Sequence, residues 1–195
     1  TNANGIAAAD YIARWDGSWH ALGSHNGNGS LADHVNAIAI SGTNVYVGGL
    51  FTNADGIATA DYVVRWDGAW NAMGSRAAGT NGALSDQVYA LLVVGRDVYA
   101  GGNFTNAADI PAADRLASWR GGAWHSVGPD SVLGERVHAL AAVGEDLYVG
   151  GHFLNAAGIA EADRVVRWDG SDWSALGSDG AGDGAIADTV LALAV

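Results

Sequence analysis

The sequence predicts an all-β protein made of repeated four-stranded antiparallel sheets, and three observations lead to this class. Three independent markers recur in one register along the chain, with successive spacings near fifty residues. Short runs rich in Val, Tyr, Trp and Leu have the composition and length of strands. No stretch keeps a helical period over the length that a helix needs. The markers are Trp15, Trp66, Trp119 and Trp168; Gly48-Gly49, Gly101-Gly102 and Gly150-Gly151; and Asn2, Asn53, Asn106 and Asn155.

One repeat reads as four strands joined by unequal connections. The strands expected in the middle repeat are 88–94, 97–104, 115–119 and 123–127. Gly-containing turns such as Gly95-Arg96 tightly join the first strand to the second, and Asp-Gly turns join the third to the fourth. The other two connections are long. Because alternate connections leave an antiparallel sheet at the same edge, one face should carry the tight turns and the opposite face all the long loops.

Four-stranded units of about fifty residues that stack side by side are typical of a β-propeller. The whole chain, 1–195, therefore reads as one propeller or propeller segment of about four repeats with one incomplete blade. The blades are a partial blade at 1–34, complete blades at 35–87, 88–136 and 137–188, and the first strand of a further or shared blade at 189–195.

The repeat resembles the kelch-like class of propeller repeat. The segments that carry the resemblance are the strand ending in Gly-Gly at 45–49, the Arg-Trp-Asp-Gly segment at 65–68, and the strand that begins at Trp70. The same pattern is similar to repeats of bacterial and fungal cell-surface proteins. The resemblance implies a propeller fold and a binding or structural role. The Asn-Ala-x-x-Ile block, as in 53–57, departs from the usual kelch spacing.

The strand count leaves the ring open. It gives fifteen strands where four complete blades need sixteen, and the missing strand is the Gly-Gly strand of the split blade. Three interpretations remain: a piece of a longer propeller, several copies that assemble across their ends, or a self-sufficient four-bladed ring. The start at Thr1, with no initiator Met, fits an excised or processed segment.

Composition excludes several function classes. With no Cys, the chain can form neither a disulfide scaffold nor a Cys-ligated metal site. A net charge of −12 disfavours nucleic-acid binding, and no run of apolar residues is long enough for membrane insertion. No nucleophile elbow, zinc-protease motif or phosphate-binding loop is present in the sequence, so we expect no enzyme, no cofactor and no metal. The absence of Cys and Lys and the low charge density favour an extracellular or cell-surface location.

Recurrent side chains are expected to build the scaffold. The four tryptophan pairs are interpreted as inter-blade core, with sugar-stacking platforms as the alternative. The Asn-Ala blocks are interpreted as self-bonded loops, with a repeated metal or sugar site as the alternative. The Gly-Gly pairs should allow a bulge or close blade packing. Arg and Asp two residues apart, as in Arg65 and Asp67, could pair. Oxygen ligands of the Asp-rich loop at 178–188 could hold Ca²⁺, although their spacing matches no EF-hand.

Divergence between repeats marks where the scaffold is free to specialise. The most divergent stretches are the loops from fourth to first strands, which should share the long-loop face. This face is polar and acidic, and it would suit a protein partner, other copies of the chain, or neutral glycans. We therefore expect a scaffold or interaction module, with a carbohydrate-binding propeller as the alternative. The candidate binding residues are Asn26, Asn28, Asp33, Arg76, Asn81, Asp86, Asp130, Arg136, Asp179, Asp183 and Asp188.

Overall fold

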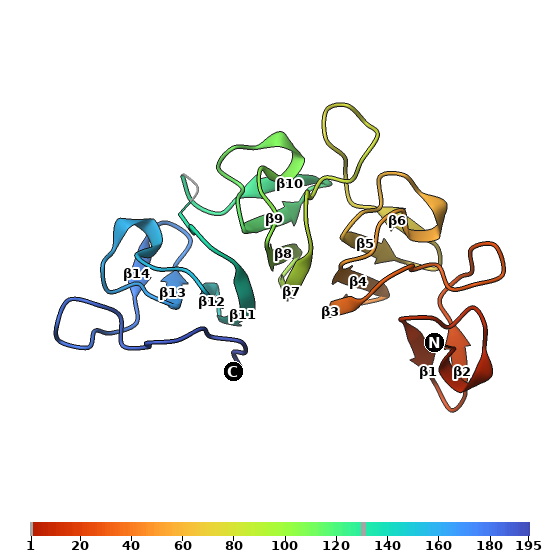
Figure 1. The fold of residues 1–195 in the computed structure, drawn as a ribbon, viewed down its shortest axis with the longest axis horizontal. Coiled ribbons are helices and arrows are strands. Elements are labelled where there is room, and N and C mark those ends of the chain that lie inside the picture. Colours follow the sequence, from red (N-terminus) through yellow and green to blue (C-terminus); the bar gives the residue numbers. More distant parts are fainter. Residues whose placement is uncertain (1, 130–131) are drawn as a thin grey trace.

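The computed structural model describes residues 2–129 and 132–195 of the chain. This part contains three four-stranded antiparallel sheets and one two-stranded sheet, which confirms the predicted all-β, blade-built class. The sheets follow one another along an open arc whose two ends do not meet (Figure 1). Within the described chain the ring is therefore not closed.

Each complete sheet keeps the chain order of its strands. The partial blade contains β1 (Ala13–Trp15) and β2 (Trp19–Ala21). The first complete blade contains β3 (Val35–Ser41), β4 (Asn44–Gly49), β5 (Val63–Trp66) and β6 (Trp70–Ala72). The second contains β7 (Val88–Val94), β8 (Asp97–Gly102), β9 (Leu116–Arg120) and β10 (Ala123–Ser126). The third contains β11 (Val137–Val143), β12 (Asp146–Gly151), β13 (Val165–Trp168) and β14 (Trp173–Ala175).

The first strands β3, β7 and β11 lie on the inner side of the arc, and the later strands lie progressively further out (Figure 1). In the first complete blade, Val45 pairs with Trp66, and Trp66 pairs with Trp70. Every first strand carries one register shift close to its start, as between Val88 and Ala90. This bulge lies opposite the Gly-Gly pair, where the sequence analysis predicted a bulge or tight packing.

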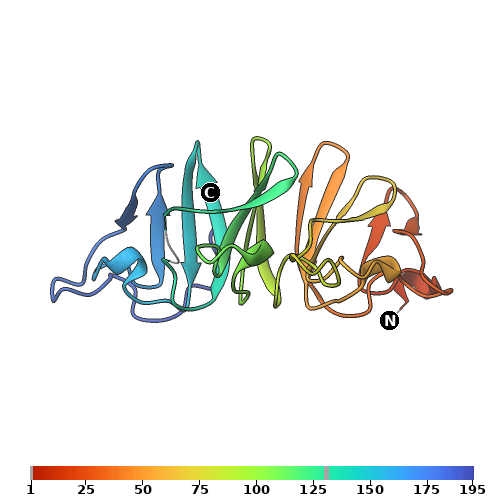
Figure 2. The ribbon, with the colours of Figure 1, turned by 90° about the horizontal axis from the view of Figure 1, so that it is seen from above.

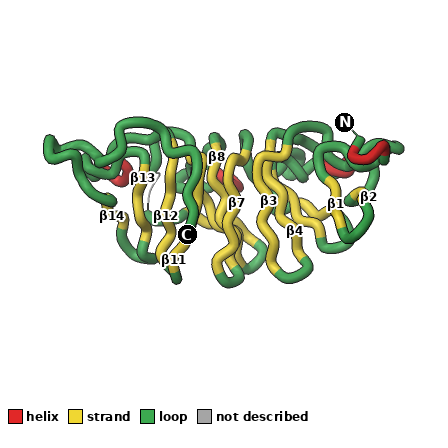
Figure 3. Tube along the Cα trace, turned by 90° about the horizontal axis from the view of Figure 1, so that it is seen from below, coloured by secondary structure: helices red, strands yellow, loops and turns green. Residues whose placement is uncertain are grey.

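The two faces of the arc differ as predicted. Tight hairpin turns lie along one edge, and the long loops lie along the other (Figures 2 and 3). Each long loop that leads into a third strand contains a single 3₁₀ turn. These turns are η1 (Ala3–Gly5), η2 (Ala54–Gly56), η3 (Ala107–Asp109) and η4 (Ala156–Gly158).

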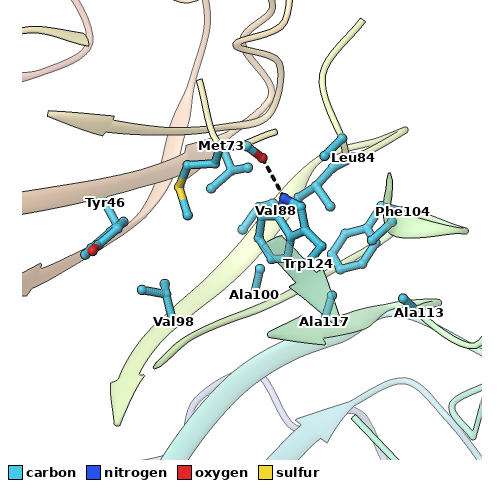
Figure 4. Packing of buried hydrophobic residues seen from close by; sticks show 13 residues of the cluster. Tyr46, Met73, Leu84, Val88, Val98, Ala100, Phe104, Ala113, Ala117 and Trp124 are labelled. Atoms are coloured by element: carbon cyan, nitrogen blue, oxygen red, sulfur yellow. Dashed lines mark hydrogen bonds between the residues drawn. The ribbon is translucent and has the colours of Figure 1, made fainter. Parts of the chain in front are cut away.

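Trp70 and Trp124 join consecutive blades, in agreement with the inter-blade interpretation, whereas Trp15 and Trp19, which that interpretation also included, are exposed. The indole N–H of Trp124 donates to the carbonyl oxygen of Met73 in the preceding blade at 2.6 Å (Figure 4). Trp70 makes the same bond to the carbonyl of Leu22 at 2.7 Å. Both side chains are about 5 % exposed or less. A buried indole needs such a partner, so this bond fixes how neighbouring blades meet.

The Gly-Gly pairs allow close approach between blades and within them. A Cβ on Gly48 would lie 2.6 Å from a methyl carbon of Val88, on the first strand of the next blade. A Cβ on Gly49 would collide with the carbonyl oxygen of His34 within the same blade. Both positions therefore exclude any larger residue, because the neighbouring atoms are already at contact distance.

Three phenylalanines that the sequence analysis did not single out are fully buried. They follow the Gly-Gly pairs by two residues and have the spacing of the other markers: Phe51, Phe104 and Phe153. Figure 4 shows Phe104 beside Trp124 in the core of the middle blade. The regular spacing alone could have identified them as core.

The structure differs from two expectations in detail. Residues 189–195, predicted as a first strand, form no β-ladder. Val190 packs on Gly150 in the place of a first strand, but its backbone makes only one bond to that blade, from its N–H to the carbonyl of Gly151 at 3.2 Å. The described chain supplies no second strand for this segment to pair with, so a ladder cannot form.

The repeated Arg–Asp pair is the second expectation from which the structure differs. Arg14 pairs with Asp16 at 2.8 Å and Arg65 with Asp67 at 2.9 Å, as expected. Arg167 instead bonds Asp146 on the adjacent strand at 2.9 Å. These groups are about one-third exposed or more, so each pair contributes only about 0–1 kcal/mol.

Candidate functional site

The long-loop face is organised by a buried aspartate in the first and third complete blades. Asn53 adopts the left-handed conformation (φ 51°) and leads into η2, which starts the loop. The carboxylate of Asp61 then accepts the N–H of Asn53 at 2.8 Å and the N–H of Gly82 at 2.9 Å. Since Gly82 belongs to the loop between the fourth and first strands, Asp61 ties the two long loops of this blade together.

The same clamp recurs in the third blade. Asp163 accepts the N–H of Asn155 at 2.7 Å and the N–H of Gly184 at 3.3 Å. A Cβ on Gly184 would lie 2.7 Å from the Cβ of Asp163, so only glycine fits at this crossing. The Asn-Ala block is therefore a self-bonded loop in these blades, as the scaffold interpretation predicted.

Above the first clamp lies a polar hollow of about 460 Å³. The guanidinium of Arg76 spans from this hollow to the next blade, where it donates to the carbonyl of Thr105 at 2.8 Å and pairs with Asp109 at 3.3 Å. Arg76 thus fastens two blades together, and its charge is largely neutralised. The hollow is lined by Thr52, Asn53, Asp61, Tyr62, Arg76, Asn81, Leu84 and Ser85.

The matching hollow above the second clamp has about 380 Å³ and a different charge. Asp163, Asp179 and Asp183 line it together with a single cation, Arg164. The pKa of Asp179 is lowered, mainly because its carboxylate accepts the backbone N–H of Ala181 and then that of Asp183. The carboxylate is therefore ionised at neutral pH, and this hollow is acidic.

Three predicted binding residues instead close the turns that enter β3, β7 and the segment 189–195. Asp86 accepts the backbone N–H of Gln87 at 2.7 Å and the amide of Asn103 at 2.7 Å. Asp33 and Asp188 accept the N–H of the next residue in the same way, at 2.7 and 2.6 Å. This backbone bond is the main cause that lowers the pKa of both groups. These carboxylates are engaged in local structure.

The remaining predicted residues are scattered. Asn28 forms an isolated bridge with His25, and the amide of Asn26 lies 2.8 Å from the His25 ring. Arg136 donates to the side-chain oxygen of Asn103 at 3.3 Å. Asp130 lies outside the described residues. The structure thus brings Arg76 with Asn81, and Asp179 with Asp183, but gathers no single site from all the predicted positions.

A row of side chains on the inner side of the arc was not predicted. At the bulge of each first strand, one residue is freed from the ladder: Asn36, Tyr89 and His138. The Asn36 amide donates to the carbonyl of Val88 at 3.0 Å, and the rings of Tyr89 and His138 lie 4.8 Å apart. Burial lowers the pKa of His138, and nearby Arg136 and His152 lower it further. Differing residues at one repeat position were the signal that could have revealed this row.

Among residues 2–129 and 132–195, no group of three or more His, Asp or Glu side chains could hold a metal ion. None of the helices in this part of the chain has the length and apolar character needed to cross a bilayer.

Comparison with protein-family models and with curated proteins gave no match. Among solved structures, the chain is similar to the computationally designed Ika8 protein, with 17 % identity and a TM-score of 0.46. It is also similar to the computationally designed Ika4 protein (19 %, 0.43) and to YjhT (16 %, 0.47). The similarity covers 89, 77 and 86 % of this chain and 43, 72 and 57 % of those chains, respectively. The chain thus spans less than half the length of Ika8 and somewhat more than half of YjhT.

Proposed function

We propose that this chain is a non-enzymatic propeller segment of kelch-like type, part of an exported or cell-surface protein, which binds a protein partner through its long-loop face. One observation carries the proposal. The same buried Asp clamp supports two hollows of similar size whose linings differ in charge. A fixed support with variable side chains above it is the arrangement expected of a recognition surface.

The charge of the surface indicates the kind of partner. In the first hollow the single cation, Arg76, is already paired with Asp109. In the second hollow Asp163, Asp179 and Asp183 outnumber Arg164, and the chain as a whole has a net charge of −12. A partner with a basic patch would be attracted to the hollow above Asp163, and an acidic partner would be repelled.

Sugar recognition is favoured less than protein binding. Stacking on a sugar needs an accessible aromatic ring, yet Trp70 and Trp124 are buried between blades. Trp15 and Trp19 are exposed, but they lie at the end of the arc, next to a tight turn. Carbohydrate binding is therefore the second candidate function, and the experiment below includes a measurement that would favour it.

The test uses fluorescent basic, neutral and acidic peptides, titrated with the full chain at low and moderate salt. We expect saturable binding of basic peptides, weakened several-fold by Asp183→Asn, because this change removes one negative charge from the hollow. Glu145→Gln is the matched control, since Glu145 is exposed at a tight turn on the opposite face. Equal loss in both variants, or no preference for basic peptides, would contradict the proposal. Saturable binding on an array of neutral glycans would favour the carbohydrate alternative.

A further inference from the structure

The N-terminal end of the arc exposes side chains that are buried or partly buried in the other blades. Trp19 is 41 % exposed, whereas Trp70 and Trp124, at the same repeat position, are 5 and 4 % exposed. On the first strand of the next blade, Ile38 is 50 % exposed, whereas Leu91 is partly buried at the corresponding place. The sequence repeats here, but the neighbour that would cover these residues is absent from the described chain.

Between blades, the indoles of Trp70 and Trp124 are covered by the same structural seat. The seat consists of the last residue of the preceding fourth-strand segment, which offers its carbonyl, and the glycine that follows it. Trp70 lies over Gly23 with its Nε1 3.1 Å from a Cβ built there, and it donates to the carbonyl of Leu22. Trp124 uses Met73 and Gly74 in the same manner. Trp173 shares only the glycine part of this seat: its Nε1 lies 2.7 Å from a Cβ built on Gly128, but it has no hydrogen-bond partner among the described residues.

The C-terminal end of the arc carries the next seat of this series. Leu176 and Gly177 follow β14 as Leu22 and Gly23 follow β2. Leu176 is 42 % exposed, and a Cβ on Gly177 meets only Ala185, at 3.6 Å, with no indole within 4 Å. One end of the chain thus presents an uncovered indole, and the other end presents the seat that such an indole occupies in the interior.

We propose that the N-terminal end of one copy docks on the C-terminal end of a second copy, with Trp19 seated over Leu176 and Gly177. The contact would repeat the interface that already joins the blades within one chain. It is heterologous, joining two different surfaces, so successive copies form a ring if the rotation closes and an open filament if it does not.

The segment 189–195 gives this joint a second contact. Val190 already lies on Gly150, as Val88 lies on Gly48, so the segment stands where a first strand belongs. Docking would bring β1 and β2 of the other copy in as the third and fourth strands of a shared blade. The shared blade would still lack a second strand. The place of that strand coincides with an apolar hollow of about 520 Å³ beside β1 and β3. Ile12, Leu22, Ile38, Ile40, Val45 and Trp66 are its apolar lining.

The proposed joint lies at the ends of the arc and does not depend on the long-loop face. Loss of peptide binding would therefore leave this inference intact, and loss of association would leave the proposed function intact. The two can be tested on the same protein preparation.

The decisive experiment measures solution mass by light scattering and sedimentation for the full chain and two variants. Wild-type protein should show concentration-dependent association. Trp19→Ala damages only the indole end, and Leu176→Arg damages only the seat. Each alone should weaken association roughly 30-fold, because a truncated hot-spot residue typically costs about that factor. An equimolar mixture should restore one intact joint and stop at a 1:1 pair, since each partner contributes one undamaged end.

The matched control is Leu154→Arg, which places the same cation at an exposed leucine of the long-loop face and should leave association unchanged. Recovery of the pair in the mixture also demonstrates that both variants are folded. Wild-type protein that stays monomeric at millimolar concentration would overturn the proposal. So would association that is insensitive to both variants, or variants that associate alone but not with each other.

Discussion

Trp19 and Trp70 stand at one repeat position, yet one is exposed and the other is buried. Both follow the same kind of tight turn and pair with the preceding tryptophan of their own hairpin, Trp15 or Trp66. The difference is the neighbour: Trp70 reaches the carbonyl of Leu22 in the blade before it, and the described chain places no blade before Trp19. Burial in this fold is therefore a property of the junction between blades more than of the blade itself.

A similar contrast separates β7 from the segment 189–195. Both pack a valine on a Gly-Gly strand, but only β7 has a second strand beside it and forms a ladder. Side-chain packing between blades and strand pairing within a blade thus contribute separately to the stability of the fold. Each can be removed by substitutions that leave the other in place.

Truncating a tryptophan should give the largest difference in unfolding free energy between a blade junction and the exposed N-terminal end. Trp124→Ala removes a buried indole from the core around Met73 and Phe104 and should lower the free energy of unfolding by about 3–5 kcal/mol. Trp19→Ala, at the exposed end, should cost less than about 1 kcal/mol in dilute protein. Urea unfolding of both variants measures this, and equal losses would contradict the junction account.

A smaller loss is expected when the Gly-Gly strand is filled. Gly102→Ala would press a methyl group on the backbone carbonyl of Gln87 and should destabilise by about 1–3 kcal/mol. Gly134→Ala is the matched control, because a Cβ at Gly134 meets no atom within 4 Å. Thermal unfolding compares the pair. A neutral Gly102 variant would mean that the close approach of the strands is dispensable.

The loop clamp should contribute less again. Asp61→Ala leaves the N–H groups of Asn53 and Gly82 without their acceptor and should cost about 1–2 kcal/mol. Asp67→Ala, at a partly exposed tight turn, should stay within about 0.5 kcal/mol. Hydrogen exchange at Asn53 and Gly82 locates the effect, and unchanged protection of these two amides would exclude the clamp.

The smallest expected effect is a pH dependence of stability that comes from His138, on the inner side of the arc. Since burial and nearby cations lower the pKa of folded His138, the unfolded chain binds its proton more readily than the folded chain. Stability should therefore fall as pH drops below about 6.5, the pKa of an unperturbed histidine. His138→Gln should flatten this dependence, measured by urea unfolding at several pH values. An NMR titration that places the His138 pKa at or above the ordinary value would contradict it.

Local and repeated features could be predicted from the sequence. The markers identified the blades, the tight-turn face, the bulges at Gly-Gly and the tryptophan junctions, because each repeat must satisfy the same packing. The bounds of β7 agree with the predicted run at 88–94. The buried phenylalanines recur with the same spacing, so this signal could have predicted them as well.

Properties that depend on a neighbour could not be predicted in this way. The sequence pattern of 189–195 is that of a first strand, but a ladder needs a partner strand that the described chain lacks. Asp33, Asp86 and Asp188 were predicted as binding residues, and their carboxylates accept backbone N–H groups at turns. Whether a polar side chain is free or engaged is decided by backbone geometry that residue type does not reveal.

The most direct test of the junction account is the exchange rate of the indole N–H protons, followed by NMR as protein concentration rises. In dilute protein the N–H of Trp70 and Trp124 should be strongly protected and that of Trp19 should exchange rapidly. With increasing concentration Trp19 should become protected as the copies dock. Equal protection of all three indoles in dilute protein, or rapid exchange at Trp124, would contradict the account.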